Sequence, residues 1–358
     1  MKHTHLLLLT AILSLLSTGC EKNQDRPHQI DYSQGIFIIN EGSFQSNNGS
    51  VSYYDAAGGS ITNGIFEAAN GRPLGDVVQS FAIVSDTVGI IIVNGSAKLE
   101  VVNIETFRTI ANPIPAAYPR QFCQVTPDAG YLTGGNLQGY VFILDLGTFE
   151  ITDSIKAGYG PDALIMHENM VYVANSGGWA TDSTVYKILV SGNQIVDTFQ
   201  VGKTPADLTF DGDDMLWIYC RGQAVYSWDP PYNLISETDA LLQKVDIANG
   251  NILWQGEVGK AGDYTGTPPR IASSPDGAFI YYLRPDGVYK ISSVSPDIPV
   301  TPLITGNYYG MDVNPADGNI FIFESVFTGN GTMKIFTADG IPVAEGMVGI
   351  APNGAVFP

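Results

Sequence analysis

Histidine is scarce in this sequence, and its positions argue against most catalytic and metal-binding chemistry. The 358 residues include four histidines. His3 and His5 lie in an N-terminal apolar segment, His28 in a polar stretch, and His167 between two predicted strands. None falls in the long loops that we expect to carry the binding surface, so the commonest acid–base group and metal ligand is missing there. We therefore expect a protein that is not an enzyme and has no metal site.

Cations and cysteines are also few. The chain has 17 Lys and Arg against 36 Asp and Glu, a net charge of −19. Removing residues 1–19, which contain Lys2 and no acid, leaves 16 cations and a net charge of −20. Such a surface repels nucleic acid and anionic lipids. Cys123 and Cys220 lie in neighbouring repeats without metal-ligand spacing, so we expect two buried thiols, with a disulfide as the alternative in an oxidising compartment.

Long apolar runs are absent apart from one near the N-terminus. The run Leu6–Leu16 follows Lys2 and leads into Leu16-Ser-Thr-Gly-Cys20, which is the layout of a signal peptide and too short to span a bilayer. The last five residues resemble the bacterial lipobox, which implies that Cys20 is acylated and that the lipid is the contact with the membrane. An ordinary secretory signal with an incidental cysteine is the alternative. We expect a signal peptide at 1–19, a lipidated flexible tether at 20–34 and a folded domain at 35–358.

A short phrase repeats through the chain, in which a proline is followed at once by an apolar strand. It occurs at Pro119, Pro161, Pro205, Pro269 and Pro352, and the first two gaps are 42 and 44 residues. The next gap of 64 residues is one period plus an insertion, and the last gap of 83 holds two periods. A period of about 40–45 residues filled with short strands predicts a β-propeller with one sheet per repeat.

The repeats predict an all-β fold, a seven-bladed β-propeller with four-stranded blades. The seven inner strands are expected to begin near Val77, Arg120, Asp162, Ala206, Arg270, Gly310 and Asn353. The first blade lacks its own inner strand, because Gly35–Asn40 matches the second strand of the other repeats. The phrase at Pro352–Phe357 supplies that strand. We therefore expect the C-terminal strand to pair in the N-terminal blade and close the ring, which leaves no open sheet edge.

The two faces of the predicted disc differ in loop length. Turns between first and second strands, such as Pro127-Asp128-Ala129, are short. The connections on the opposite face, which we name the long-loop face, are longer and span 40–49, 66–76, 111–119, 174–184, 219–240, 257–269 and 324–331. Surplus loop length on one face of a rigid scaffold usually serves binding, so we expect the ligand there. Drift in unconstrained loops is the alternative.

The long-loop face carries many aromatic side chains with polar donors among them. Aromatic walls with a few donors suit a large, partly apolar ligand or a protein surface. The predicted ligand-binding residues are Phe44, Tyr118, Arg120, Tyr159, Trp179, Arg221, Trp228, Tyr264, Arg270, Tyr308, Tyr309 and Phe327. The tyrosines at 118, 159, 308 and 309 precede inner strands and are expected to rim the central channel. For a single aromatic the alternative is packing of its own loop, and for Arg120, Arg270 and Asp162 it is a ring of salt bridges between blades.

Two stretches of the sequence resemble known propellers. The unit Gly158–Ile188, with Val171-Tyr-Val-Ala-Asn175 and Val185-Tyr-Lys-Ile188, is similar to the YncE-like class of seven-bladed propellers. The opening Gly35-Ile-Phe-Ile-Ile-Asn-Glu-Gly-Ser-Phe44, joined to a lipobox, resembles more narrowly the propeller lipoproteins of gut Bacteroidetes, including the BtuG type. The resemblance covers residues 35–358.

The resemblance implies a non-catalytic lipoprotein on the outer face of the outer membrane. Such a protein binds cobalamin or a related corrinoid and passes it to a TonB-dependent transporter, so the corrinoid is a transported ligand and no cofactor is required. Two alternatives stay open: a protein–protein interaction scaffold on the cell surface, and a carboxylate- or calcium-dependent hydrolase or lyase. For the latter, Asp211-Gly-Asp-Asp214 resembles a calcium loop but lacks the terminal Glu of an EF-hand, and we interpret it as a turn.

Overall fold

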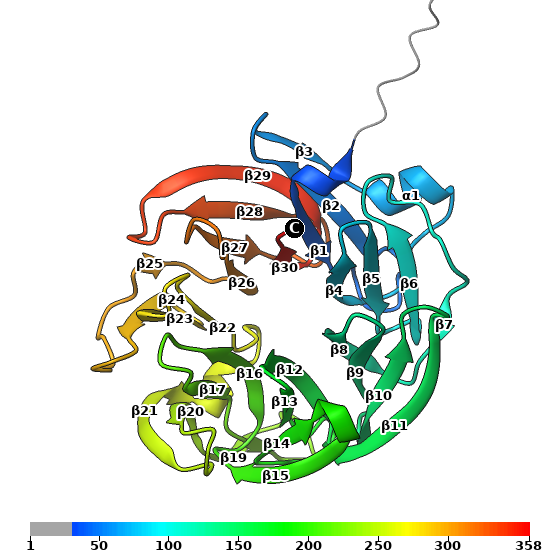
Figure 1. Cartoon of the computed structure of the whole chain (residues 1–358). Helices are drawn as coiled ribbons and strands as arrows, with labels where there is room; N and C mark the ends of the chain where they lie inside the picture. The colour runs from blue at the N-terminus through cyan, green and yellow to red at the C-terminus, as the bar shows by residue number, and fades with distance from the viewer. Residues whose placement is uncertain (1–30) are drawn as a thin grey trace, which may run out of the picture. The chain divides into compact units, whose positions relative to one another are not determined.

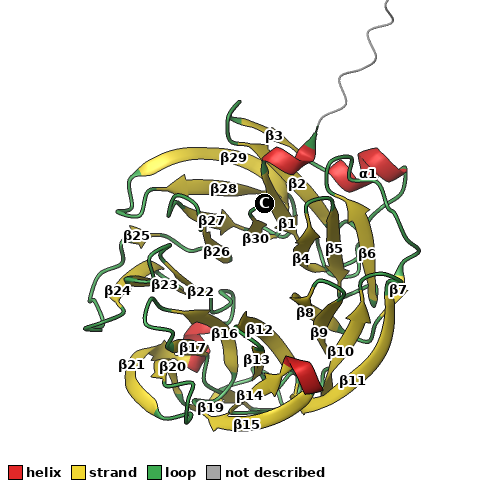
Figure 2. Cartoon of the chain, in the orientation of Figure 1, coloured by secondary structure: helices red, strands yellow, loops and turns green. Residues whose placement is uncertain are grey.

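Seven antiparallel sheets are arranged in a ring (Figure 1). A computed structural model describes residues 31–358. Each of the seven sheets has four strands, and helix is confined to short pieces before the first strand and between later strands of the described residues (Figure 2). The prediction of an all-β, seven-bladed propeller with four-stranded blades is therefore confirmed.

The blades are numbered in chain order, and each is a sheet whose innermost strand faces the centre of the ring. Blade 1 contains β1 (Ile36–Asn40), β2 (Ser50–Asp55), β3 (Ser60–Thr62) and β30 (Pro352–Val356). Blade 2 contains β4 (Val78–Ser85), β5 (Val88–Val93), β6 (Lys98–Asn103) and β7 (Ile114–Pro115). Blade 3 contains β8 (Pro119–Thr126), β9 (Ala129–Gly134), β10 (Gln138–Asp145) and β11 (Glu150–Tyr159). Blade 4 contains β12 (Pro161–His167), β13 (Met170–Asn175), β14 (Thr184–Leu189) and β15 (Gln194–Gln200).

The other three blades follow the same plan, with one insertion. Blade 5 contains β16 (Pro205–Phe210), β17 (Leu216–Cys220), β20 (Asp239–Val245) and β21 (Ile252–Lys260), and the hairpin of β18 (Ala224–Tyr226) and β19 (Leu234–Glu237) is inserted between β17 and β20. Blade 6 contains β22 (Ile271–Ser273), β23 (Phe279–Arg284), β24 (Gly287–Ser292) and β25 (Ile304–Thr305). Blade 7 contains β26 (Gly310–Val313), β27 (Ile320–Glu324), β28 (Asn330–Phe336) and β29 (Pro342–Ile350). The helical pieces are α1 (Ile65–Asn70), η1 (Tyr32–Gln34), η2 (Val190–Gly192) and η3 (Ala261–Tyr264).

The second strand of each blade is buried because neighbouring blades cover both faces of the sheet. Five of the six residues are buried in β5 and in β13, which explains why their sequences are continuous apolar runs rather than alternating ones. The outer strand β15 is mostly exposed and polar by comparison. Burial on both faces therefore separates inner from outer strands in the sequence as well as in the fold.

Strand β1 shows how one strand joins two blade interfaces. The Phe37 ring packs edge-on against Phe81 of blade 2, with 5.2 Å between ring centroids. The next residue, Ile38, lies on the other face of the sheet, in a core cluster with Phe321 and Phe323 of blade 7, because successive strand residues point to opposite faces. Fully burying a side chain of this size stabilises the fold by about 1.5–3 kcal/mol. Blade 1 thus depends on both neighbours.

The C-terminal strand closes the ring, as predicted. β30 is hydrogen-bonded to β1 in antiparallel register, with Ile38 opposite Ala355 and Ile39 opposite Gly354. Beyond the strand, the Glu41 backbone N–H donates to the Ala351 carbonyl at 2.9 Å. Asn40 pairs with Pro352, 312 positions further along the chain (352 − 40), and the inner edge of β1 is covered.

The repeated proline marks the point where the chain turns into an inner strand. Pro119, Pro161, Pro205 and Pro352 are the first residues of β8, β12, β16 and β30, a position where the missing N–H costs no ladder hydrogen bond. The residue before each of them has a left-handed backbone, with φ of 48° at Tyr118, 49° at Gly160, 56° at Thr204 and 51° at Ala351. A Cβ on Gly160 would lie 2.2 Å from the Gly178 N atom, so this turn requires glycine.

Residues 31–34, which the prediction assigned to the tether, contact the propeller. Within the stretch interpreted as tether, Tyr32 packs edge-on against Tyr53, with ring centroids 5.0 Å apart, and its N–H donates to the Glu105 carbonyl at 3.0 Å. These contacts hold η1 on the propeller. The predicted signal peptide, Cys20 and the tether up to residue 30 lie outside the described residues.

The two cysteines of the propeller are free thiols, with Cys220 buried and Cys123 half-buried. Burial raises the pKa of both thiols, so they stay protonated and unreactive at neutral pH. No helix within residues 31–358 is long and apolar enough to cross a bilayer.

Removing the last eight residues, 351–358, is expected to prevent stable folding. The deletion takes away β30 and leaves β1 with an unpaired edge at the centre of the ring. Thermal melting followed by circular dichroism, together with size-exclusion chromatography, measures the effect. A chain lacking only Pro358 keeps β30 and is the matched control. An unchanged melting temperature in the longer deletion would contradict ring closure as a source of stability.

Candidate functional site

A cavity of about 660 Å³ lies on the long-loop face, where the inner strands begin. We name it the mouth cavity. Its walls come from the connections that precede inner strands and from those between second and third strands, including Gly160, Thr204 and Trp179. These connections all end at one face because strand direction alternates across each blade. The mouth cavity thus lies on the face where the loop lengths predicted a binding site.

Eight of the twelve predicted site residues line the mouth cavity. They are Phe44, Arg120, Trp179, Arg221, Tyr264, Arg270, Tyr309 and Phe327. The other four, Tyr118, Tyr159, Trp228 and Tyr308, are not part of its lining. These eight predicted residues come from every blade of the ring except blade 2.

Exposed aromatic side chains form part of the cavity wall. Phe44 is 75% exposed and Trp179 is 72% exposed. The Trp179 backbone N–H donates to the Asn136 carbonyl at 2.8 Å, and the Tyr118 ring packs edge-on behind the indole, with centroids 6.0 Å apart. Tyr118 thus supports Trp179 rather than lining the cavity. On the opposite side of the ring, Tyr309 and Phe327 pack edge-on with centroids 5.0 Å apart.

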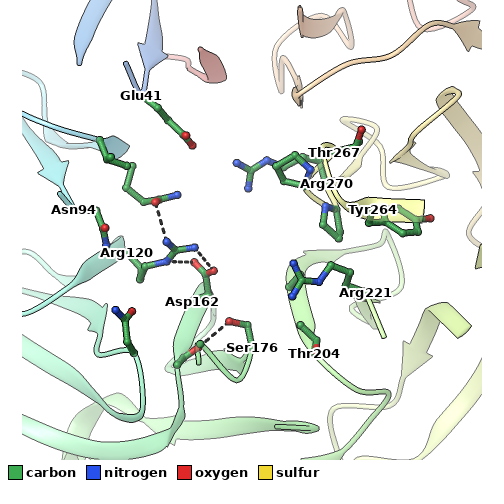
Figure 3. Close-up of a pocket in the computed structure, with 18 of the residues that line it drawn as sticks. Glu41, Asn94, Arg120, Asp162, Ser176, Thr204, Arg221, Tyr264, Thr267 and Arg270 are labelled. Carbon is green, nitrogen blue, oxygen red and sulfur yellow. Dashed lines mark hydrogen bonds and ion pairs between the residues drawn. The ribbon is translucent and has the colours of Figure 1, made fainter. Parts of the chain in front are cut away.

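Arg120 links three blades at the cavity wall. Its guanidinium donates to both carboxylate oxygens of Asp162, at 3.1 and 2.6 Å, and to Gln79 Oε1 at 2.9 Å (Figure 3). Burial alone would lower the pKa of Arg120, but Asp162 outweighs it and raises the pKa. The Arg120 guanidinium therefore binds residues of blades 2 and 4. Arg120 links blades, as the salt-bridge alternative expected.

Glu41 connects the cavity wall to the ring closure. Its two carboxylate oxygens accept hydrogen bonds from Asn353 Nδ2 at 2.7 Å and from the Tyr309 hydroxyl at 2.9 Å. Burial and the Glu41 charge together raise the pKa of Tyr309, so the phenol remains a neutral donor. Blades 1 and 7 are therefore joined through a carboxylate that also faces the cavity.

Arg221 and Arg270 extend into the mouth cavity from its other side (Figure 3). Arg221 follows β17, and its backbone N–H donates to the Thr204 carbonyl at 2.9 Å. Arg270 precedes β22, and its carbonyl accepts from the Leu283 N–H at 2.9 Å. The lining holds these two arginines and Arg120 against the carboxylates Glu41 and Asp162. One wall of an otherwise acidic protein is therefore cationic.

A second cavity of about 250 Å³ lies deeper along the inner strands. We name it the channel cavity. Arg270 lines it as well as the mouth cavity, together with Asp207 and Asp312. Burial raises the pKa of Asp312 to about 7 and that of Asp207 to about 6, although backbone donors and Arg270 lower both. The two carboxyl groups therefore titrate near neutral pH.

Tyr308, Tyr264 and Trp228 differ from their predicted placement. Tyr308 is only 4% exposed and packs in a core cluster, with its hydroxyl donating to the Thr305 carbonyl at 2.9 Å. Tyr264 reaches the cavity, but its ring is buried and its hydroxyl donates to the Val258 carbonyl at 2.7 Å. Trp228 is 97% exposed at the tip of the β18–β19 hairpin. Successive residues of an extended chain point to opposite sides, so only one of the two adjacent tyrosines can face the channel. Tyr309 lines the mouth cavity, and Tyr308 packs in the core.

His167 and Asp211, the residues considered for acid–base or calcium chemistry, have structural partners. His167, the last residue of β12, stacks on Phe210 with ring centroids 4.5 Å apart. Asp211 accepts from Trp217 Nε1 at 2.9 Å and forms an ion pair with Lys244 at 2.7 Å, so the Asp211–Asp214 segment is a turn, as interpreted. Among residues 31–358 no group of three or more His, Cys, Asp or Glu is placed to hold a metal ion.

Sequence reasoning missed several residues that line the mouth cavity. Gln79 and Glu41 come from blades 2 and 1, and Thr265–Pro269 forms a continuous stretch of wall before β22. Thr267 is buried there at 2% exposure. The available signal was position: Gln79 and the Thr265–Pro269 stretch lie near the start of an inner strand, and Glu41 directly follows a second strand, as Arg221 does.

The fold and the mouth cavity define a seven-bladed β-propeller with a ligand-sized site at one end of its channel. The chain belongs to the DUF5074 family, described as a domain of unknown function, whose pattern matches residues 34–336. No curated protein matches the chain.

Several solved structures share the fold. A quinonprotein alcohol dehydrogenase-like protein from Bacteroides thetaiotaomicron matches over 91% of this chain and 79% of its own, with 14% identity and a TM-score of 0.63. A functionally unknown protein from Desulfotomaculum acetoxidans matches over 90% and 98%, with 14% identity and a TM-score of 0.60. Dihydro-heme d1 dehydrogenase NirN in complex with DHE matches over 91% and 75%, with 11% identity and a TM-score of 0.55. At these identities the likeness shows the fold alone.

The titration of Asp312 predicts a pH dependence of stability. A carboxyl group whose pKa is higher in the folded than in the unfolded state stabilises the fold at low pH and loses that contribution as pH rises. With a folded pKa of about 7, the loss falls between about pH 4 and pH 7. Asp312→Asn is expected to flatten this decline and to be more stable than wild type at pH 8 by at least about 1 kcal/mol, since one pKa unit corresponds to about 1.4 kcal/mol.

Thermal melting from pH 4 to pH 8 measures this dependence. Asp86→Asn, at an exposed acid in the turn after β4, is the matched control and should follow the wild-type curve. Parallel curves for Asp312→Asn and wild type would show that Asp312 does not carry the effect.

Proposed function

We propose that the protein captures a corrinoid such as cobalamin in the mouth cavity, at the cell surface, and passes it to a TonB-dependent outer-membrane transporter. The mouth cavity carries this proposal. It combines a volume of about 660 Å³ with exposed aromatic walls and arginine side chains, and ligand sites typically have about 300–1,000 Å³ with a few placed polar groups. The function is binding and delivery, without chemistry on the ligand.

The chemistry of a corrinoid suits this lining. A corrinoid is a flat macrocycle with apolar faces and an edge of amide side chains, and cobalamin adds one phosphodiester. Phe44, Trp179 and Phe327 offer apolar surface to such a face, while Asn94 and Asn136 offer amide partners at the rim. None of the described residues that line the mouth cavity is a histidine, so binding would leave the axial ligands of the cobalt in place. A propeller named for dihydro-heme d1 among the structural neighbours is consistent with a macrocyclic ligand on this scaffold.

The β18–β19 hairpin favours protein docking as a second function. Trp228 at its tip is 97% exposed, and Ile235 is 65% exposed. Exposed aromatic side chains of this kind are frequent energetic anchors of protein interfaces. The hairpin belongs to the long-loop face beside the mouth cavity, so docking onto a transporter and ligand capture are compatible.

Titrating the protein with cyanocobalamin by isothermal titration calorimetry tests the main proposal. Binding with a micromolar or lower dissociation constant supports it. No heat and no change in the visible spectrum at such concentrations would remove the corrinoid and favour the docking function. Hydrolase or lyase activity that a chelator abolishes would instead favour the carboxylate- or calcium-dependent enzyme.

Trp179→Ala is expected to weaken corrinoid binding by at least about 1 kcal/mol, as aromatic anchors in binding sites do. The indole stands on the cavity wall and is exposed in the free protein, so its loss should leave the melting temperature nearly unchanged. Trp228→Ala, which removes an exposed indole outside the mouth cavity, is the matched control. Equal affinity in both variants would place the ligand elsewhere.

Cys20→Ala is expected to abolish acylation and to move the protein from the membrane to the soluble fraction. The physical reason is that the N-terminal lipid is the proposed anchor. Labelling with palmitate followed by cell fractionation measures both effects, and Cys123→Ala is the control that should keep the label. Labelled Cys20→Ala protein would refute the lipobox interpretation.

A further inference from the structure

Two arginine side chains in the mouth cavity have no partner within the described part of the chain. Neither Arg221 nor Arg270 donates a side-chain hydrogen bond or forms an ion pair with any of residues 31–358, whereas Arg120 is held by Asp162 and Gln79 and Arg72 by Glu100. Arg221 is exposed and Arg270 is half-buried, so both guanidinium groups are free to donate hydrogen bonds to a ligand in the cavity.

The two guanidinium groups converge from different blades. Arg221 extends from the end of β17 in blade 5, and Arg270 from the start of β22 in blade 6, and both point toward the space enclosed by the cavity walls (Figure 3). Their backbones are fixed by hydrogen bonds to Thr204 and Leu283. The arginines are thus carried by rigid strand ends, which favours a preformed site over a mobile surface charge.

The carboxylates of the mouth cavity do not neutralise this pair. Asp162 is bound by Arg120, and Glu41 accepts from Tyr309 and Asn353. The lining therefore holds three arginines against two carboxylates in a protein of net charge −19. Asp207 and Asp312 lie deeper, in the channel cavity, and raise the pKa of Arg270 from that side. The excess of positive charge therefore belongs to the lining of the mouth cavity alone.

The environment of each arginine adds to the case. The Arg221 side chain is exposed, and its partial burial in the cavity lowers its pKa. For Arg270, burial acts in the same direction, but Asp207 and Asp312 raise the pKa above its ordinary value. Both side chains stay charged at neutral pH, and an anion between them would accept hydrogen bonds from both.

We propose that Arg221 and Arg270 form an anion subsite of the mouth cavity that binds a phosphate group. Each guanidinium presents a planar fork of N–H donors that matches pairs of phosphate oxygens. Two forks on separate blades suit a tetrahedral group better than a single planar carboxylate. The phosphate belongs either to a larger ligand, such as the phosphodiester of cobalamin, or to free phosphate; the first case rests on the proposed function and the second does not.

Inorganic phosphate tests the subsite without a corrinoid. The melting temperature of wild-type protein should rise as phosphate is added at constant ionic strength, and Arg221→Gln and Arg270→Gln should lose this rise. Arg108→Gln is the matched control, because Arg108 is exposed outside both cavities, and it should respond as wild type does. Arg270 also balances the negative charge of Asp207 and Asp312, so Arg270→Gln can destabilise the fold. Arg221→Gln tests the subsite independently of that effect.

Corrinoids with and without the phosphodiester test the subsite within the proposed function. Cyanocobalamin should bind wild-type protein about tenfold or more tightly than dicyanocobinamide, which lacks the phosphate, because hydrogen bonds to charged groups have this strength. Each Arg→Gln variant should lose that preference and bind cobinamide as wild type does. The wild-type preference should also shrink as salt is added.

The outcomes separate the two proposals. If phosphate stabilises wild type through both arginines but no corrinoid binds, the anion subsite stands and the corrinoid function fails. If cyanocobalamin binds wild type and both variants equally, and phosphate gives no stabilisation, the corrinoid function stands and the subsite is overturned. A preference for cyanocobalamin that both variants lose supports the subsite whether or not free phosphate binds.

Discussion

Burial of both faces of every sheet is the constraint on which this structure depends. A four-stranded sheet whose inner strands are apolar on both faces cannot be stable alone, and each blade here covers the faces of two others. Phe37 and Ile38, adjacent in β1, pack into opposite interfaces. In a linear row of blades, each terminal blade would leave one apolar face in water. A closed ring removes that exposed face, and the pairing of β30 with β1 connects the two ends.

The same geometry creates the site. Inner strands converge on the centre of the ring, so the residues at their starts lie close together although they are distant in sequence. Arg120, Asp162 and Arg270 all occupy such starts. Some of these side chains hold blades together and others face the cavity without partners. Glu41 belongs to both groups, since it joins blades 1 and 7 and lines the mouth cavity.

Much of the fold could be predicted from the sequence because the signal is repeated. A single proline before an apolar strand means little, but the same phrase at Pro119, Pro161 and Pro205 reports the same turn each time, and the structure places each proline at the first position of an inner strand. Loop length likewise reports topology, which is why the long-loop face and part of the cavity lining could be anticipated.

The site could be predicted only in part, since sequence gives position along a strand but not the direction of a side chain. Tyr308 and Tyr309 are neighbours of equal chemistry, yet one is in the core and the other lines the cavity. Gln79 has no distinguishing pattern and is part of the wall because Arg120 of the next blade reaches it. The absence of partners around Arg221 and Arg270 is a property of three-dimensional packing, and no spacing rule reports it.

The pairing of β30 with β1 has a consequence for the order of events during biosynthesis. The ribosome releases β30 more than 300 residues after β1, a separation also seen in the contact between Asn353 and Glu41. Until then blade 1 is a three-stranded sheet with its inner edge open, and the six following blades have no fixed first neighbour. Pairing of this last strand closes a loop of more than 300 residues, which costs chain entropy. Until that pairing forms, the inner edge of β1 is open to pairing with other chains.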